Sequence, residues 1–302
     1  MEMTERRIPS VDGVHQLYCR VYMPDGEIKG LFHVAHGMTE HIRRSGYDNF
    51  MRFMAEHGYI CYGYDHLGHG YTVKDESELG YLGEWKLLVK DVQNVSKLMK
   101  EEFGKDLPCY LLGHSMGSFI VRCASSPAIW DKVIYMGTGG PNPASKAGLA
   151  MIKSKIKKKG GHAVDFSIEK LVFGSYCKHF KDENDSIAWL CTQKDTRDVY
   201  RADDLCGFHF TLNGFYALIK LQSLSNSKKW FKEISDKLPI LLVSGGDDPV
   251  GNYGKGVKTV YKNLKKNGKN VQMKLYDGCR HEILNDVCRE EVINDILTFV
   301  ES

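Results

Sequence analysis

Short apolar runs, each closed by a glycine or a polar turn, recur along this chain with longer helical patterns between them. The runs are QLYCRVYM, GLFHVAHG, GYICYGYD, CYLLGHS, KVIYMGTG, PILLVSGG and VQMKLYDG. Most are apolar without alternation, which is typical of strands covered on both faces. Helices between such strands form parallel crossovers. We therefore predict an α/β fold with a mostly parallel central sheet flanked by helices, and QLYCRVYM as part of an edge hairpin.

The segment from about Pro143 to Lys229 breaks this rhythm. It holds helix-like pieces and many aromatic residues but no comparable strand. Insertions after a sheet strand usually project from the carboxyl edge, where α/β proteins bind ligands. We predict a core formed by residues 1–142 and 230–302, and a helical cap of residues 143–229 inserted after the sixth strand. We expect the cap to be apolar because it shields a ligand, without being core.

Composition excludes some classes of protein. A net charge of +3 in 302 residues gives no sign of a nucleic-acid partner. The chain has no run of about 18 apolar residues and no apolar leader at its N-terminus, so we expect neither a membrane span nor secretion. Its nine cysteines are irregularly spaced without metal-ligand patterns. We predict reduced thiols, Cys279 included, a cytoplasmic location and no metal; oligomeric state is left open.

The sequence GHSMG places Ser115 between two glycines, with CYLL before it and SFIVRCA after it. This matches the Gly-x-Ser-x-Gly turn in which a serine is exposed between a strand and a helix. Side chains at Gly113 and Gly117 would collide with the neighbouring strand and helix. We predict that Ser115 is a catalytic nucleophile.

A serine needs a base and an acid to act as a nucleophile. His281 follows the last strand and precedes the last helix, so it shares the carboxyl edge with Ser115. Asp247 and Asp248 end the preceding strand at that same edge. Only one of them can face His281, and we prefer Asp248; Asp277 is a distant third choice. The order Ser115, Asp248, His281 is that of α/β-hydrolases.

The oxyanion formed during acyl transfer needs two fixed N–H donors. The residue after the nucleophile, Met116, supplies one. The second is expected from the loop after LFHVAHG, where Gly37 permits a tight turn and the following N–H belongs to Met38.

The chain resembles the monoacylglycerol lipase and lysophospholipase branch of the α/β-hydrolases, also called serine aminopeptidase-like. The resemblance rests on HGMTEH, YDHLGHG, GHSMGS, SGGDDPVGNYGKGV and RHEILND, in that order. It implies an acid three residues after Gly245, which is Asp248, with His281 as base and Met38 and Met116 as oxyanion donors.

Other positions have two readings. The resemblance puts Glu40 and Arg44 at the polar end of the substrate pocket, but at this spacing they can also pair with each other. It treats His66 and His69 as support beneath the oxyanion turn, so we assign them no catalytic or metal role. The basic run from Lys153 to His162 is either a solvated helix face or a contact with anionic lipid.

These residues predict a serine hydrolase that cleaves carboxylic esters of single-chain lipids through an acyl-enzyme on Ser115, without a cofactor. The substrate is a small lipid or ester, of monoacylglycerol or lysophospholipid type. An aminopeptidase or amidase would use the same triad, and acidic residues in the cap could bind a substrate amine. A non-catalytic receptor on this fold is the third reading, although such proteins usually lose part of the triad.

Overall fold

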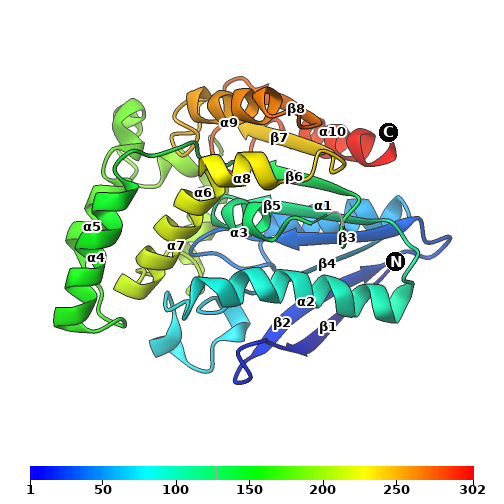
Figure 1. Ribbon diagram of the computed structural model, residues 1–302, viewed down its shortest axis with the longest axis horizontal. Helices are drawn as coiled ribbons and strands as arrows, with labels where there is room; N and C mark the ends of the chain where they lie inside the picture. Colours follow the sequence, from blue (N-terminus) through cyan, green and yellow to red (C-terminus); the bar gives the residue numbers. More distant parts are fainter. Residues whose placement is uncertain (127) are drawn as a thin grey trace.

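A computed structural model describes residues 1–126 and 128–302 and contains one eight-stranded sheet (Figure 1). The strand order is β1-β2-β4-β3-β5-β6-β7-β8. The strands are β1 (Glu2–Pro9), β2 (Gln16–Met23), β3 (Gly30–Ala35), β4 (Tyr59–Tyr64), β5 (Cys109–His114), β6 (Lys132–Met136), β7 (Ile240–Gly245) and β8 (Val271–Tyr276). β2 is antiparallel to β1 and to β4, whereas the six strands from β4 to β8 in the sheet are parallel. The predicted α/β class is confirmed.

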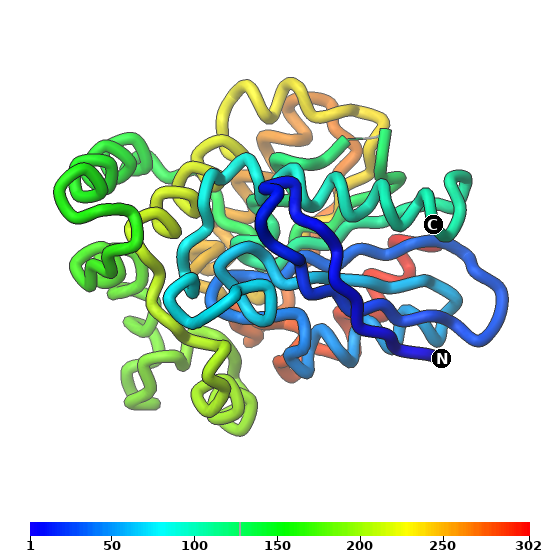
Figure 2. Tube along the Cα trace, turned by 90° about the horizontal axis from the view of Figure 1, so that it is seen from below, coloured from blue at the N-terminus to red at the C-terminus, as the bar shows by residue number. Residues whose placement is uncertain are grey.

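Strand burial explains the sequence pattern. Every residue of β3, β4, β5 and β7 is buried, as expected for strands covered on both faces. β1, whose sequence is EMTERRIP, is mostly exposed or half-buried and pairs with all eight residues of β2 in an edge hairpin (Figure 2). Because the sequence of β1 is polar, this strand was not recognised from the sequence, although a hairpin that includes β2 was predicted at the sheet edge.

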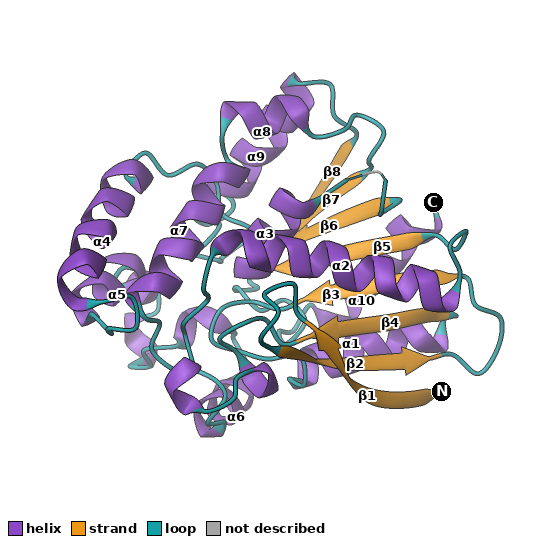
Figure 3. Cartoon of the chain, turned by 60° about the horizontal axis from the view of Figure 1, so that its bottom comes forward, coloured by secondary structure: helices purple, strands orange, loops and turns teal. Residues whose placement is uncertain are grey.

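Helices cover both faces of the sheet (Figure 3). On one face, α1 and α10 pack Phe50 and Ile296 into a cluster with Phe32 of β3. On the other, α2, α3, α8 and α9 join a larger cluster that includes Leu111 of β5. The bounds are α1 (Ser45–Glu56), α2 (Trp85–Phe103), α3 (Met116–Ala124), α8 (Lys228–Glu233), α9 (Lys255–Lys266) and α10 (Arg289–Glu301).

The segment between β6 and β7 is helical and lies at the end of the molecule away from both termini (Figure 2). It contains α4 (Ser145–Lys159), α5 (Phe166–Phe173), α6 (Lys194–Ala202) and α7 (Leu212–Ser225). Its short 3-10 turns are η3 (Tyr176–His179), η4 (Lys181–Glu183) and η5 (Ala188–Leu190), whereas η1 (Gly70–Thr72) and η2 (Glu76–Glu78) lie between β4 and α2.

The inner part of this segment belongs to the core. α7 packs against α3, and Phe210, Phe215 and Leu221 are buried in the same hydrophobic cluster as the sheet. The expectation that the cap is apolar without being core is therefore wrong for these residues. The division at residues 142 and 230 stays a prediction.

In the part of the chain that the structure describes, no helix combines the length and apolar character needed to cross a bilayer.

Candidate active site

Ser115 occupies a strained turn between β5 and α3. Its φ of 51° and ψ of −117° lie outside the regions that residues with side chains usually adopt. The Ser115 N–H donates to the Met136 carbonyl at 2.9 Å, which ties the turn to the end of β6. A Cβ on Gly113 would lie 2.5 Å from the Gly117 carbonyl oxygen, and one on Gly117 would overlap the Ala35 carbonyl. The two glycines thus allow the strand, turn and helix to approach closely.

His281 and Asp248 form a buried pair at the carboxyl edge of the sheet. His281 Nδ1 lies 2.9 Å from Asp248 Oδ2, and the two residues are 2% and 0% exposed. Asp248 also accepts hydrogen bonds from the Ser244 hydroxyl and the Val250 N–H. Asp247 is exposed, and its backbone N–H donates to the Cys279 carbonyl. This geometry favours Asp248 as the partner of His281 and leaves Nε2 of the ring as a proton acceptor.

Gly137 shows how closely the base region packs on the turn that holds Ser115. It follows β6 with a φ of 58°, and a Cβ there would lie 3.2 Å from His281 Cε1 and 3.2 Å from His114 Cδ2. His114 immediately precedes Ser115, and its Nε2 lies 3.3 Å from the His281 carbonyl oxygen. His281 and the strand that delivers Ser115 are therefore in direct contact.

The turn after β3 lies beside Ser115. A Cβ on Gly37 would lie 3.1 Å from Ser115 Cβ. The Gly37 N–H donates to Glu40 Oε1 at 2.6 Å, and the Thr39 N–H donates to His69 Nε2 at 3.2 Å. Among the described residues, the intervening Met38 N–H has no hydrogen-bond acceptor. Such a free donor is what an oxyanion hole requires.

Met116 supplies the other predicted donor as the first residue of α3. The N–H groups of a first helical turn have no partner within the helix, and the helix dipole favours negative charge there. Both N–H groups therefore suit an oxyanion, and their role in catalysis is taken up as a proposal below.

Glu40, Arg44 and Glu282 are buried, and Arg44 pairs with both carboxylates. Glu282 is the residue after His281. Arg44 reaches Glu40 Oε2 at 2.5 Å and Glu282 Oε2 at 2.8 Å. Burial alone would raise the pKa of Glu40, but His114 and Arg44 hold that pKa well below its usual value. The same Glu40 carboxylate raises the pKa of His114 against the effect of burial. The ion-pair alternative is thus favoured over direct substrate binding by Glu40 and Arg44.

Three residues of this network were not predicted from the sequence: Glu282, His114 and Tyr47. The Tyr47 hydroxyl donates to Glu40 Oε1 at 2.6 Å and lies 2.8 Å from His114 Nδ1. Local patterns carry no signal for such partners, since Arg44 and Glu282 are 238 residues apart in the chain.

His66 and His69 form hydrogen bonds to the turn after β3. The His66 N–H donates to His36 Nε2 at 3.0 Å, and His69 Nε2 accepts the Thr39 N–H. Burial lowers the pKa of His66 to about 3 and that of His69 to about 4. Both rings are therefore neutral hydrogen-bonding groups.

The cap is bonded directly to the loop that carries the base. The His281 N–H donates to the Trp189 carbonyl at 3.4 Å, and the Glu282 N–H donates to the Leu190 carbonyl at 2.7 Å. The Trp189 ring lies 5.2 Å from the His281 ring and also contacts Phe173 and Tyr176. An aromatic cluster of the cap thus packs against His281 through Trp189.

Cys279 and Cys288 are joined by a disulfide that encloses the base loop. The prediction of reduced thiols throughout, and of Cys279 as a free buried thiol, is wrong for this pair. A spacing of nine residues resembles no recognised framework, so the sequence held no signal for it. The other seven cysteines are free.

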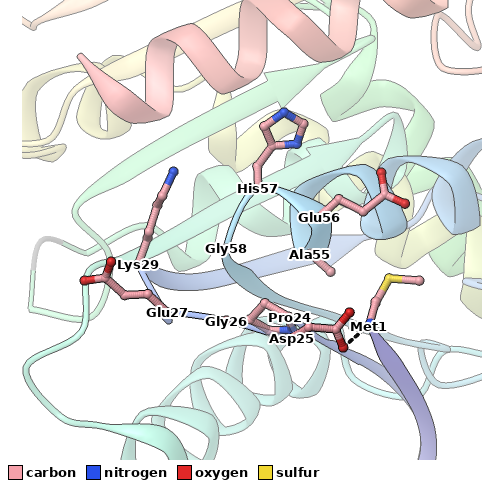
Figure 4. A pocket seen from close by; sticks show the side chains of 10 residues that line it. All are labelled: Met1, Pro24, Asp25, Gly26, Glu27, Lys29, Ala55, Glu56, His57 and Gly58. Carbon is pink, nitrogen blue, oxygen red and sulfur yellow. Dashed lines mark ion pairs between the residues drawn. The ribbon is translucent and has the colours of Figure 1, made fainter.

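A pocket at the opposite edge of the sheet is separate from this site (Figure 4). It lies where β3 and β4 begin, whereas Ser115 and His281 lie at the carboxyl edge. Its lining residues are Met1, Pro24, Asp25, Gly26, Glu27, Lys29, Ala55, Glu56, His57 and Gly58.

Removing the Arg44 charge is expected to destabilise the folded protein. Arg44→Met leaves the Glu40 and Glu282 carboxylates buried without their shared cation, so we expect the free energy of unfolding to fall by about 3–5 kcal/mol. Arg43→Met is the matched control, because Arg43 is exposed. Urea unfolding of both variants measures the difference, and equal stabilities would contradict the importance of the network.

Comparisons with known proteins agree with this geometry. The family described as serine aminopeptidase, S33, matches residues 26–287, which include Ser115, Asp248 and His281. A monoglyceride lipase from Mus musculus is 26% identical over 276 residues, or 90% of this chain and 81% of that protein. A monoacylglycerol lipase from Mycolicibacterium smegmatis is 25% identical over 306 residues, or 99% and 97%. A solved structure of a thermostable carboxyl esterase from Bacillus coagulans, in complex with glycerol, is similar with a TM-score of 0.93 and 28% identity, covering 100% of this chain and 98% of that one.

Proposed function

Since the chain belongs to the serine aminopeptidase S33 family, we propose that it is a serine hydrolase acting on single-chain lipid esters. The substrate is of monoacylglycerol or lysophospholipid type. The similarity to monoglyceride lipases and to a carboxyl esterase supports ester cleavage. The observation that carries the proposal is the buried pair of His281 and Asp248 beside the strained turn at Ser115.

In the proposed mechanism, His281 Nε2 takes the hydroxyl proton of Ser115 as the serine oxygen attacks the ester carbonyl. The Met38 and Met116 N–H groups hold the resulting oxyanion, and Asp248 stabilises the imidazolium. His281 then gives its proton to the leaving alcohol, which forms the acyl-enzyme. Water, deprotonated by the same histidine, attacks the acyl carbon; the bond to Ser115 Oγ then breaks as His281 returns the proton to that oxygen, which releases the fatty acid and free Ser115.

The charges of the cap favour an ester over an amine-bearing peptide. Three acids of the cap are already paired with arginines: Glu183 and Asp185 with Arg197, and Asp198 with Arg201. A carboxylate held in this way is less available to a substrate amine.

A substrate panel tests the proposal. The purified chain is expected to hydrolyse a long-chain monoacylglycerol and a lysophospholipid faster than an aminoacyl-arylamide. Covalent labelling of Ser115 by a fluorophosphonate reports whether the nucleophile is active at all. If Ser115 is labelled but the protein hydrolyses the arylamide faster than the lipid esters, the lipid-ester assignment is overturned. If Ser115 is not labelled, a non-catalytic receptor is favoured.

We also propose a transient contact between the cap and anionic membranes. Lys157 and Lys158 of α4 are exposed, and Phe166 and Leu171 of α5 are 65% and 68% exposed. The neighbouring Lys155 is bound to Asp165 at the start of α5. α4 and α5 lie together at the outer end of the cap (Figures 1 and 3). Exposed lysines beside exposed apolar side chains suit a lipid surface.

Vesicle sedimentation tests this contact. Replacing both Lys157 and Lys158 by glutamine is expected to weaken binding to vesicles rich in phosphatidylserine by about 30-fold, from about 1 kcal/mol per charge. Lys262→Gln with Lys266→Gln is the control, because these two exposed lysines lie on α9, outside the cap. Equal binding of the two double variants would contradict the proposed surface.

A cytoplasmic location is likewise our proposal. The seven free cysteines support it, whereas the disulfide between Cys279 and Cys288 does not.

A further inference from the structure

A second cluster of reactive side chains lies outside the proposed triad, where the turn after β3 meets the cap. His41 of the turn and Cys206 of the cap are buried, and Asp203, next to the end of α6, is partly exposed. One ligand atom from each residue, a nitrogen, an oxygen and a sulfur, lies within 4.8 Å of the other two. His41 Nε2 and Asp203 Oδ2 are 2.8 Å apart.

We infer that His41, Asp203 and Cys206 form a binding site for a thiophilic divalent cation of the Zn²⁺ type. Cysteine, histidine and aspartate are all Zn²⁺ ligands, whereas Mg²⁺ and Ca²⁺ prefer oxygen alone. Zn²⁺ bonds of about 2.0–2.3 Å put ligand atoms ~3–4 Å apart, so a small closure of the three side chains suffices. Three protein ligands leave a fourth position open to water.

The surroundings already orient the ligands. The second carboxylate oxygen of Asp203 accepts the Leu205 N–H at 2.9 Å, and the Cys206 N–H donates to the Asp203 carbonyl at 2.9 Å. The Gly207 N–H donates to the Thr39 carbonyl at 3.0 Å, which fixes the cap segment on the turn. Outer hydrogen bonds of this kind hold metal ligands in place.

Local charge also suits a cation. The Arg44 guanidinium is nearby, but Glu40 and Glu282 more than offset its charge. A thiolate and a carboxylate would neutralise the metal ion. Binding through Nε2 moves the His41 ring proton to Nδ1 and gives up the 3.2 Å contact from the Arg43 N–H.

The site joins two parts of the protein that the proposed reaction uses. His41 lies three residues from Met38, whose N–H is proposed to hold the oxyanion, while Asp203 and Cys206 belong to the cap. A bound cation would therefore cross-link the cap to the oxyanion turn. This consequence rests on the proposed function, but metal binding itself does not.

Co²⁺ titration of the chelator-treated full chain tests the site, because Co²⁺ replaces Zn²⁺ and a thiolate–Co²⁺ bond gives an intense near-ultraviolet charge-transfer band. We expect this band in the parent protein, its displacement by Zn²⁺, and its loss in Cys206→Ser. Asp203→Asn, at a partly exposed position, should bind at least about tenfold more weakly.

Cys177→Ser is the matched control, since Cys177 is another free cysteine of the cap and lies outside the cluster. It should keep the band, and metal-free thermal melting of each variant confirms that it is folded. Absence of the band, or an equal band in Cys206→Ser, would overturn the inference. Because the readout is metal binding, ester hydrolysis can succeed or fail independently of it.

Discussion

Ser115→Ala is expected to lower kcat for p-nitrophenyl ester hydrolysis on the order of 10⁶-fold, the scale on which loss of a serine nucleophile acts in other hydrolases. The alanine cannot form the acyl-enzyme, so only binding and the oxyanion donors remain to assist water. The strained backbone at this position is compatible with alanine to the same extent as with serine, since both carry a Cβ. Steady-state kinetics and fluorophosphonate labelling measure the loss.

Ser125→Ala is the matched control for this variant. Ser125 lies at the other end of α3, where its hydroxyl donates to the Val121 carbonyl at 2.7 Å. It should keep the parent kcat and the fluorophosphonate label. A Ser115→Ala protein that hydrolyses esters at a rate near the parent's would end the proposed mechanism.

Asp248→Asn is expected to lower kcat by about 10⁴-fold while leaving the fold intact. Its amide is nearly the same size as the carboxylate but does not stabilise the imidazolium, and it favours the wrong tautomer of His281. The main loss should appear in kcat rather than KM, because Asp248 is buried beneath the histidine and is not proposed to touch the substrate. A pH–rate profile and kcat on one ester measure the effect.

The adjacent Asp247 provides the control for this prediction. Its side chain is exposed while that of Asp248 is buried against His281 Nδ1, although the two residues are neighbours in sequence. Asp247→Asn should therefore keep kcat within about twofold, as expected for a surface change away from buried networks. A larger loss in Asp247→Asn than in Asp248→Asn would show that the acid has been assigned to the wrong residue.

Features that depend on the residues of a single strand or helix, and on the order of these elements, could be predicted from the sequence. Buried strands such as β3 and β5 are continuous apolar runs, and their carboxyl ends share one edge of a parallel sheet. That rule alone brought Ser115, Asp248 and His281 to the same edge. β1 was concealed because only one of its eight residues is buried, and an exposed edge strand has no apolar signal.

Features that depend on tertiary contacts could not be predicted in this way. Pairing of Arg44 with Glu40 was one of two readings of their spacing, and the two do pair, but the second partner of Arg44, Glu282, lies 238 residues further on. The cap's aromatic density gave no means of separating Phe215, which is core, from Trp189, which approaches His281. Each of these roles is set by what another segment places opposite the side chain.

The packing of α7 limits how this protein can be re-engineered. Because α7 shares a hydrophobic cluster with α3 and the sheet, a graft that exchanges all of residues 143–229 with a relative would also replace part of the core. A chimera that exchanges only α4 and α5 replaces fewer residues of that cluster, Ile152 and Ile168 among them, and keeps α7 together with the backbone bonds from residues 189 and 190 to the base loop. Exchange of the outer helices alone therefore disturbs the core less than exchange of the whole segment.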